Sequence, residues 1–304
     1  MVKTGIILLG FGAPRNMSEV EPFITHIFRG KKPPERVIAE MQERYLALGG
    51  TSPYFATTCA QGKLLEELIR KRGQNITVHI GMLHSEPFIS DTMDQMIQKG
   101  IERIIAITLA PFYSKVSTGA YENEIAKKVK SDPNIRVVYL NHWCHHPFFI
   151  ESWAQKIARS LQGFSHPADV RLVFTAHSLP SDPPEDAACY DKQYQEAVRL
   201  IVDKLAHKKF TVTYQSKGKR PIPWLGPFVE EVIDKLSSKG EEQVLIVPIG
   251  FVSDHMETLY DLDIELKNLA KLVKIDLRRI SALNDDQKFI QGLAELVLSK
   301  GIME

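Results

Sequence analysis

Cysteine is scarce in this chain of 304 residues, which has Cys59, Cys144 and Cys189 and no Cys-x-x-Cys pair. An odd and scattered set of cysteines argues against a disulfide framework, an iron–sulfur cluster and a structural zinc site. A reducing compartment fits this composition, so the expected location is the cytoplasm.

Long apolar runs and tracts of one charge are also missing. The opening MVKTGIILLGFG is too short for a membrane span and leads into a predicted strand without a signal-type cleavage region. The net charge is +1, so composition indicates neither nucleic acid nor an anionic membrane as a partner. With 44% hydrophobic residues, the chain suits one large or two ordinary globular domains.

The chain contains an internal repeat. Segments 86–125 and 226–265 align without a gap, and each runs from Pro-Phe through an amphipathic helix to Lys-Gly and an apolar strand. A second echo pairs GIILLGFGAP (5–14) with RLVFTAHSLP (171–180). The chain therefore reads as a duplication.

Helices that alternate with short Val, Ile and Leu runs predict βαβ units and parallel sheets. The expected fold is α/β, with two pseudo-equivalent Rossmann-like lobes at 1–145 and 146–304. Ligands of open α/β sheets bind beyond the carboxyl ends of the strands. A cleft between the lobes is therefore expected to hold the functional residues.

His177 is the first candidate for such a residue. It follows a buried strand in FTAHSLP, where α/β enzymes place reactive side chains. Its counterpart in the first repeat is Phe11, and the titratable groups of this alignment fall in the second half alone. The alternative is a loop histidine that is hydrogen-bonded to the backbone.

An acidic stripe is the second candidate. The segment SDHMETLYDLDIE is expected to form a helix from about Asp254. Three acidic residues then recur at every fourth position on one face: Glu257, Asp261 and Glu265. Like charges repel, and imidazole with carboxylates suits a first-row divalent cation, so a metal is expected there. A capping box of Asp254 and Glu257, followed by a solvated acidic face, is the alternative.

Three further motifs are each open to two interpretations. The FRGKK cluster at 28–32 is either a solvated loop or a set of cations for an acidic ligand. Trp224 either packs within the protein or touches a flat apolar ligand. The GFG at 10–12 lacks the third glycine of a dinucleotide fingerprint, so a tight turn explains it.

Four segments resemble the ferrochelatases, which insert ferrous iron into a porphyrin: RYLALGGTSP (44–53), TAHSLP (175–180), YQSKGKRPIPWLGP (214–227) and GFVSDHMETLYDLDIE (250–265). The resemblance covers nearly the whole chain. THIFRGKKP, HSEPFISD and LAPFYS look more like the coproporphyrin-using branch of Gram-positive bacteria. The resemblance implies two Rossmann-like lobes of the class II chelatase type.

The resemblance also implies roles for particular residues. His177 and Glu257 would be the catalytic, metal-contacting pair, and Asp261 and Glu265 would continue outward as a metal path or an outer divalent-metal site. A His177 with a near-neutral pKa could accept a pyrrole proton beside the charge of Glu257. The porphyrin side would comprise Phe11, Phe28, Arg44, Tyr45, Ser52 and Tyr121, to which the motifs above add Arg29 and Trp224.

The sequence departs from the family at three places. The Gram-positive branch usually has Tyr where Phe11 stands and often Arg where Phe28 stands. After HSLP the family commonly reads Gly-Asp-Pro-Tyr, whereas this chain has AACY at 187–190. A phenolate contact with iron from position 11 is therefore unavailable.

The expected partners are a porphyrin, with coproporphyrin III favoured over protoporphyrin IX, and ferrous iron as a substrate. No resident cofactor is required, a monomer is expected, and a transient contact with a membrane or another haem-pathway enzyme is possible. A cobalt or nickel chelatase for another tetrapyrrole is one alternative. A non-catalytic haem or porphyrin carrier is another, although the acidic stripe favours an enzyme.

Overall fold

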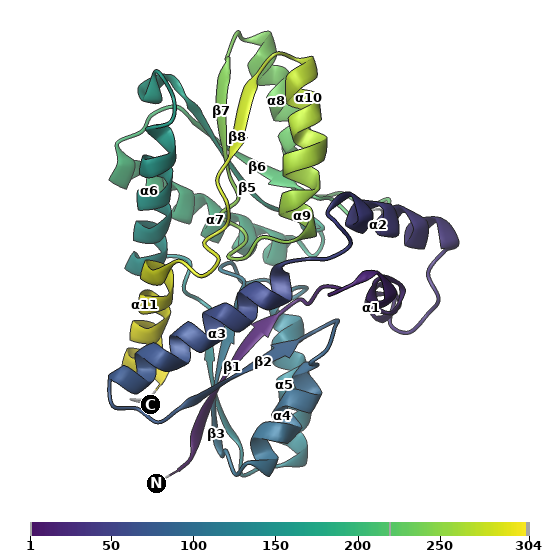
Figure 1. The fold of residues 1–304 in the computed structure, drawn as a ribbon, viewed down its shortest axis with the longest axis vertical. Coiled ribbons are helices and arrows are strands. Elements are labelled where there is room, and N and C mark those ends of the chain that lie inside the picture. Colours follow the sequence, from purple (N-terminus) through teal and green to yellow (C-terminus); the bar gives the residue numbers. More distant parts are fainter. Residues whose placement is uncertain (1, 219, 302–304) are drawn as a thin grey trace. The chain divides into compact units, whose positions relative to one another are not determined.

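The computed structural model describes residues 2–218 and 220–301, and the chain divides into two compact units (Figure 1). Unit 1 comprises Met1–Ala110, Lys115–Asn141 and Asn284–Glu304, and unit 2 comprises Pro111–Ser114 and His142–Leu283. Within the described residues, no helix is both long and apolar enough to cross a membrane.

Unit 1 is built on a parallel sheet with strand order β2-β1-β3-β4. Its strands are β1 (Thr4–Gly10), β2 (Thr77–Met82), β3 (Arg103–Thr108) and β4 (Arg136–Leu140). Its helical segments are η1 (Met17–Glu19), α1 (Val20–Ile27), α2 (Glu35–Ala47), α3 (Tyr54–Lys71), α4 (Ile89–Gln98), α5 (Thr118–Ser131), α11 (Gln287–Leu296) and η4 (Val297–Gly301).

Both faces of the unit 1 sheet are covered, which explains why β1 is apolar at consecutive positions. Ile7 and Leu9 point toward the core under α4 and α5. Leu8 points the other way and lies close to Gly62 of α3. Helix α11 packs against α3 on that second face (Figure 1).

Unit 2 repeats the arrangement with strand order β6-β5-β7-β8, again all parallel. Its strands are β5 (Arg171–His177), β6 (Phe210–Gln215), β7 (Gln243–Val247) and β8 (Asp276–Arg279). Its helical segments are α6 (Pro147–Leu161), η2 (Pro167–Asp169), α7 (Pro184–Leu205), α8 (Val229–Ser238), α9 (Met256–Leu259), the π-helical turn η3 (Asp261–Leu266) and α10 (Lys267–Leu272).

The strand register confirms the duplication residue by residue. Gly5 pairs with Ile104 in unit 1, and Arg171 pairs with Val244 in unit 2. The sequence repeats align Gly5 with Arg171 and Ile104 with Val244, so aligned residues are also paired with each other's equivalents in the sheets. Phe11 and His177 therefore occupy equivalent places after the central strands. The predicted α/β fold with two Rossmann-like parallel sheets is confirmed.

The compact units differ from the predicted division at 145/146. The segment from Asn284 onward belongs to unit 1, because α11 packs on α3 and buries Phe289 and Leu293. The short stretch 111–114 belongs to unit 2, where the Gln193 amide bonds both the N–H and the C=O of Tyr113, at 3.0 and 3.1 Å. Such long-range contacts leave no local signal in the sequence.

Candidate active site

Strand β5 delivers His177 to the carboxyl end of the unit 2 sheet. Its residues Leu172, Val173 and Phe174 are fully buried, and it pairs with β6 on one side and β7 on the other. Nδ1 of His177 donates to the main-chain oxygen of Ser178, and the Tyr190 hydroxyl donates to the main-chain oxygen of His177 at 3.0 Å. The bond at Nδ1 fixes the imidazole ring and leaves Nε2 for Glu257, and the Tyr190 bond holds the backbone at the strand end.

Glu257 meets that imidazole from the start of α9. Its Oε1 lies 3.4 Å from Nε2 of His177, and its Oε2 lies 3.4 Å from Nε2 of His255. The side chains of His177 and Glu257 are 32% and 26% exposed, so the pair is accessible from solvent. The structure therefore brings together the two residues predicted to be catalytic, and it adds His255, which the sequence analysis missed.

The charge state of the pair follows from its geometry. Burial lowers the pKa of His177, but the charge and hydrogen bond of Glu257, the Ser178 carbonyl and Asp261 outweigh it and raise that pKa to about 9. Burial raises the pKa of Glu257, and the two imidazoles outweigh it and hold that pKa well below its ordinary value. At neutral pH His177 is thus an imidazolium beside a carboxylate, not the near-neutral base that was expected.

The capping interpretation of Glu257 is wrong. Helix α9 begins at Met256 with His255 as its N-cap, and the Thr258 hydroxyl accepts from the main-chain N–H of His255 at 3.0 Å. The reciprocal partner of the capping box is therefore Thr258. Since Glu257 caps nothing, its carboxylate is available to the two histidines.

Asp254 instead belongs to a buried charge network around Arg279, the last residue of β8. The Arg279 guanidinium donates to Asp254 at 2.7 Å and to both carboxylate oxygens of Asp263, at 2.8 and 2.6 Å. The Arg279 side chain is 7% exposed. The network ties the loop before α9 and the turn after it to one strand end. The sequence around Arg279 did not indicate that this arginine would bind two carboxylates from a distant loop and turn.

Asp261 and Glu265 lie on a π-helical turn and not on the continuous α-helix that was expected. The N–H of Glu265 donates to the main-chain oxygen of Tyr260, five residues earlier, at 3.0 Å. Asp261 accepts from the Ser216 hydroxyl, and Glu265 is exposed. Across the described residues, no three His, Cys, Asp or Glu side chains are grouped closely enough to hold a metal ion.

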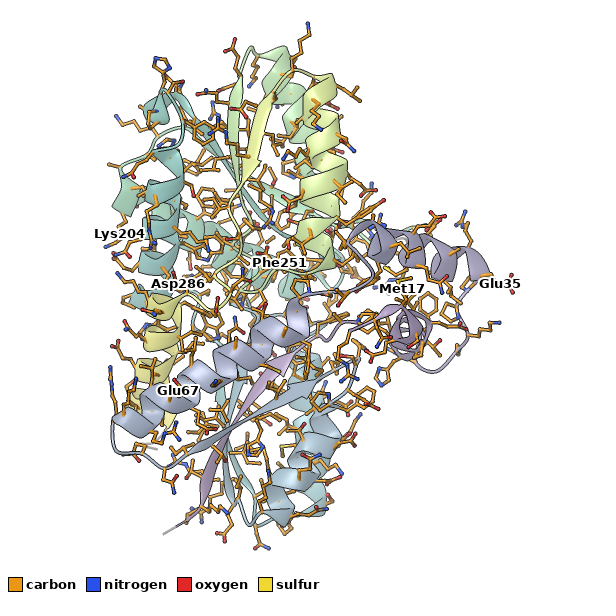
Figure 2. All side chains as sticks on the ribbon, viewed as in Figure 1. Met17, Glu35, Glu67, Lys204, Phe251 and Asp286 are labelled. Atoms are coloured by element: carbon orange, nitrogen blue, oxygen red, sulfur yellow. The ribbon has the colours of Figure 1, made fainter. Side chains whose placement is uncertain are left out.

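Gln215, at the end of β6, links the strand that carries His177 to the backbone of Glu257. It was missed by the sequence analysis. Its side-chain oxygen accepts from the Thr175 hydroxyl at 2.6 Å, and its amide donates to the main-chain oxygen of Glu257 at 2.9 Å. Gly250 completes the arrangement, since a Cβ there would lie 2.7 Å from Cα of Ala176. The loop after β7, which includes Phe251 (Figure 2), can therefore approach β5 closely.

The motif around Trp224 lies beside the loop that follows His177. Leu225 donates its N–H to Leu179 O at 2.9 Å, and its own oxygen accepts from the Ser178 hydroxyl at 2.7 Å. Trp224 packs over Gly218, where a Cβ would lie 2.4 Å from the indole. The half-buried indole therefore has a packing role, and it lies in the same unit as the catalytic pair.

The other predicted substrate residues lie in unit 1 with different exposures. Phe11 and Phe28 are 44% and 41% exposed. Arg29 is exposed and Arg44 is half-buried. Tyr45, Ser52 and Tyr121 are almost fully buried, and Tyr121 belongs to the core under α4 and α5.

Phe11 has a histidine neighbour, His84, which pairs with a second histidine, and the sequence analysis overlooked both. The rings of Phe11 and His84 are 4.6 Å apart, and Nδ1 of His84 lies 2.9 Å from Nδ1 of His26. The positions equivalent to His177 and Glu257 are still Phe11 and Ser117 in unit 1, but a pair of titratable side chains lies next to Phe11. HSEPFISD contained His84, but a lone histidine in a loop gives no sign of its partner.

The family model described as Ferrochelatase matches residues 3–301. A coproporphyrin III ferrochelatase of Geobacillus sp. (strain WCH70) is 34% identical over 98% of both chains. A ferrochelatase of Thermus thermophilus is 34% identical over 96% of this chain and 98% of its own. Among solved structures, SirB from Bacillus subtilis with Fe3+ has a TM-score of 0.62 at 16% identity, over 99% of this chain and 96% of that one, which is a likeness of fold. The chain belongs to the ferrochelatase family.

Proposed function

We propose that this protein inserts Fe²⁺ into a porphyrin in haem biosynthesis, and that coproporphyrin III is its preferred substrate. The observation that carries the proposal is the His177–Glu257 pair at the carboxyl end of β5, with Nε2 and Oε1 3.4 Å apart. Relatives at 34% identity that carry the name coproporphyrin III ferrochelatase support the choice of porphyrin.

Metal insertion requires the porphyrin to lose two pyrrole protons while Fe²⁺ sheds water. In the resting pair His177 already carries a proton, so it must release that proton to solvent before it accepts each of the two pyrrole protons in turn. An arriving dication makes this release easier, because it competes with the proton for the Glu257 carboxylate. Glu257 thus exchanges its contact with protonated His177 for a contact with the metal ion, and the deprotonated His177 becomes the base.

Asp261 and Glu265 are proposed to deliver the hydrated ion. Both carboxylates lie on the turn η3, four residues apart in the chain, so each can contact the ion in succession. Hard oxygen ligands hold a hydrated divalent cation loosely enough to pass it on. A divalent ion resting at this outer position is part of the same proposal.

The residues proposed to contact the porphyrin are those predicted substrate residues whose side chains are exposed or half-buried. Phe11 and Phe28 present aromatic surface to a flat macrocycle, and Arg29 and Arg44 present cations to its carboxylates. Trp224 is proposed as a contact from unit 2. The buried side chains Tyr45, Ser52 and Tyr121 are proposed to support this surface from beneath.

The alternatives explain less. A porphyrin carrier has no use for an imidazolium–carboxylate pair held by Gln215 and Tyr190. A chelatase for another metal and tetrapyrrole would have to depart from the substrates named in relatives that match this chain over almost its full length. A monomer that acts in the cytoplasm is part of the proposal, and all three cysteines are free thiols.

The test is anaerobic Fe²⁺ insertion with coproporphyrin III and protoporphyrin IX in parallel. We expect a higher kcat/KM for coproporphyrin III. A higher value for protoporphyrin IX would contradict the proposed preference, and the absence of insertion into either porphyrin would contradict the function itself.

A further inference from the structure

A pair of histidines lies at the edge of the unit 1 sheet where the strands end. His84 follows β2, and its main-chain N–H donates to the oxygen of Phe11 at 2.9 Å. His26 comes from the last turn of α1 and stacks on Phe88, with ring centroids 5.0 Å apart. His26 also lines a depression of about 670 Å³ together with Met17 (Figure 2) and Thr25. The pair is therefore built from the loop after β2 and the last turn of α1, both in unit 1.

The contact between the two imidazoles determines what remains free. Their Nδ1 atoms are 2.9 Å apart, so one ring donates a proton to the other. Either ring can be the donor, and where His84 is the ring that donates at Nδ1, an unprotonated lone pair remains at its Nε2. Burial, followed by the neighbouring His26, lowers the pKa of His84 to about 4, so His84 is neutral at physiological pH.

The register of the two sheets relates this position to the candidate active site of unit 2. Ile6 pairs with Val78 in unit 1, and Leu172 pairs with Phe210 in unit 2. The same spacings place His84 in unit 1 where Ser216, the partner of Asp261, stands in unit 2. They also place Phe11 where His177 stands. The imidazole of His84 thus stands beside the counterpart of the catalytic histidine.

We propose that Nε2 of His84 is an axial ligand to the iron of the metallated porphyrin, and that His26 is the positioning residue that sets its tautomer. The proposal rests on the proposed function, in which the macrocycle lies against Phe11. A phenyl ring has no donor atom, whereas imidazole nitrogen is a common axial ligand of porphyrin iron. Ligation is a coordination step without redox change: Nε2 donates its lone pair to the open axial position.

The experiment is a titration with preformed iron(III) coproporphyrin III and, separately, with metal-free coproporphyrin III. In the wild type we expect the visible and EPR spectra of nitrogen-ligated iron. His84→Ala should lose that signature and bind the iron form about tenfold or more weakly, since ligand loss commonly costs that much. Its affinity for the metal-free form should stay within about twofold.

Added imidazole should restore the nitrogen-ligated spectrum to His84→Ala, and the retained affinity for metal-free porphyrin shows that the variant is folded. His26→Asn should keep the ligand but shift the spectrum, because the hydrogen bond at Nδ1 changes. His79→Ala is the matched control, since His79 lies on β2 and bonds the Thr77 hydroxyl at 3.0 Å. It should behave as the wild type.

Identical iron spectra for the wild type and His84→Ala would overturn the proposal, as would a wild type that binds no iron porphyrin. The titration uses a preformed iron porphyrin and requires no turnover. A failure of ligation is therefore distinct from a failure of insertion, which the Fe²⁺ assay measures separately.

Discussion

At the scale of single residues, the hydrogen-bond partners of His177 and Glu257 determine the charge state of the pair. Both ring nitrogens of His177 face oxygen atoms, one from Ser178 and one from Glu257, and such an environment favours the imidazolium. Sequence reasoning found both residues, because one follows a buried strand and the other starts a motif. It could not give their charge state, which depends on contacts between segments about 80 residues apart.

The first prediction concerns the pH dependence of stability. The pKa of His177 is raised to about 9, against an ordinary value of about 6.5. Protonated His177 therefore stabilises the fold fully below about pH 6.5, and this stabilisation is lost as pH rises through about 9. Relative to Glu257→Gln, the wild-type free energy of unfolding should fall over that interval in urea titrations. Parallel curves for the two proteins would contradict the charged pair.

The second prediction concerns Gln215, which we regard as a positioning residue. Gln215→Met keeps the size but leaves the Glu257 carbonyl and the Thr175 hydroxyl without this partner, at a cost of about 1–3 kcal/mol in unfolding free energy. A displaced Glu257 should lower kcat by up to about 10²-fold. Gln195→Met, at an exposed site on α7 that bonds Asp191, is the control. Unchanged kcat in Gln215→Met would refute the positioning role.

At the scale of elements, the acidic segment shows where pattern reasoning reaches its limit. The spacing of four predicted one α-helix, but the chain forms a four-residue α9 followed by the π-helical turn η3. The start at Met256 depends on the Thr258 cap, and the turn is anchored to β8 through Asp263 and Arg279. Neither the cap geometry nor a salt bridge from a distant strand is encoded in periodicity.

The third prediction tests η3 as the route of the metal. Asp261→Asn and Glu265→Gln should each raise the KM for Fe²⁺ several-fold and change kcat little, because they remove carboxylates met before the chemical step. Asp276→Asn is the control, since Asp276 lies on β8 and pairs with Arg278 in solvent. A fall in kcat with unchanged KM would place these carboxylates at the reacting centre and contradict a delivery role.

At the scale of the whole molecule, the duplication could be predicted from the sequence because each repeat keeps its own helix, strand and turn signals. Helices α4 and α8 begin and end at equivalent positions, as the gapless alignment predicted. The sequence did not predict that α11 packs in unit 1, since the pattern of an amphipathic helix does not indicate which sheet the helix covers. The same limit hid the partnership of His26 and His84, which are 58 residues apart.

The most direct test of the account is anaerobic Fe²⁺ insertion into coproporphyrin III by the wild type and by Glu257→Gln. The account predicts turnover in the wild type and a loss of about 10²–10⁴-fold in Glu257→Gln, with porphyrin binding by fluorescence titration retained. Glu241→Gln, which removes a carboxylate that pairs with Arg171 away from His177, should retain turnover. Wild-type turnover in Glu257→Gln would contradict the claim that the His177–Glu257 pair performs metal insertion.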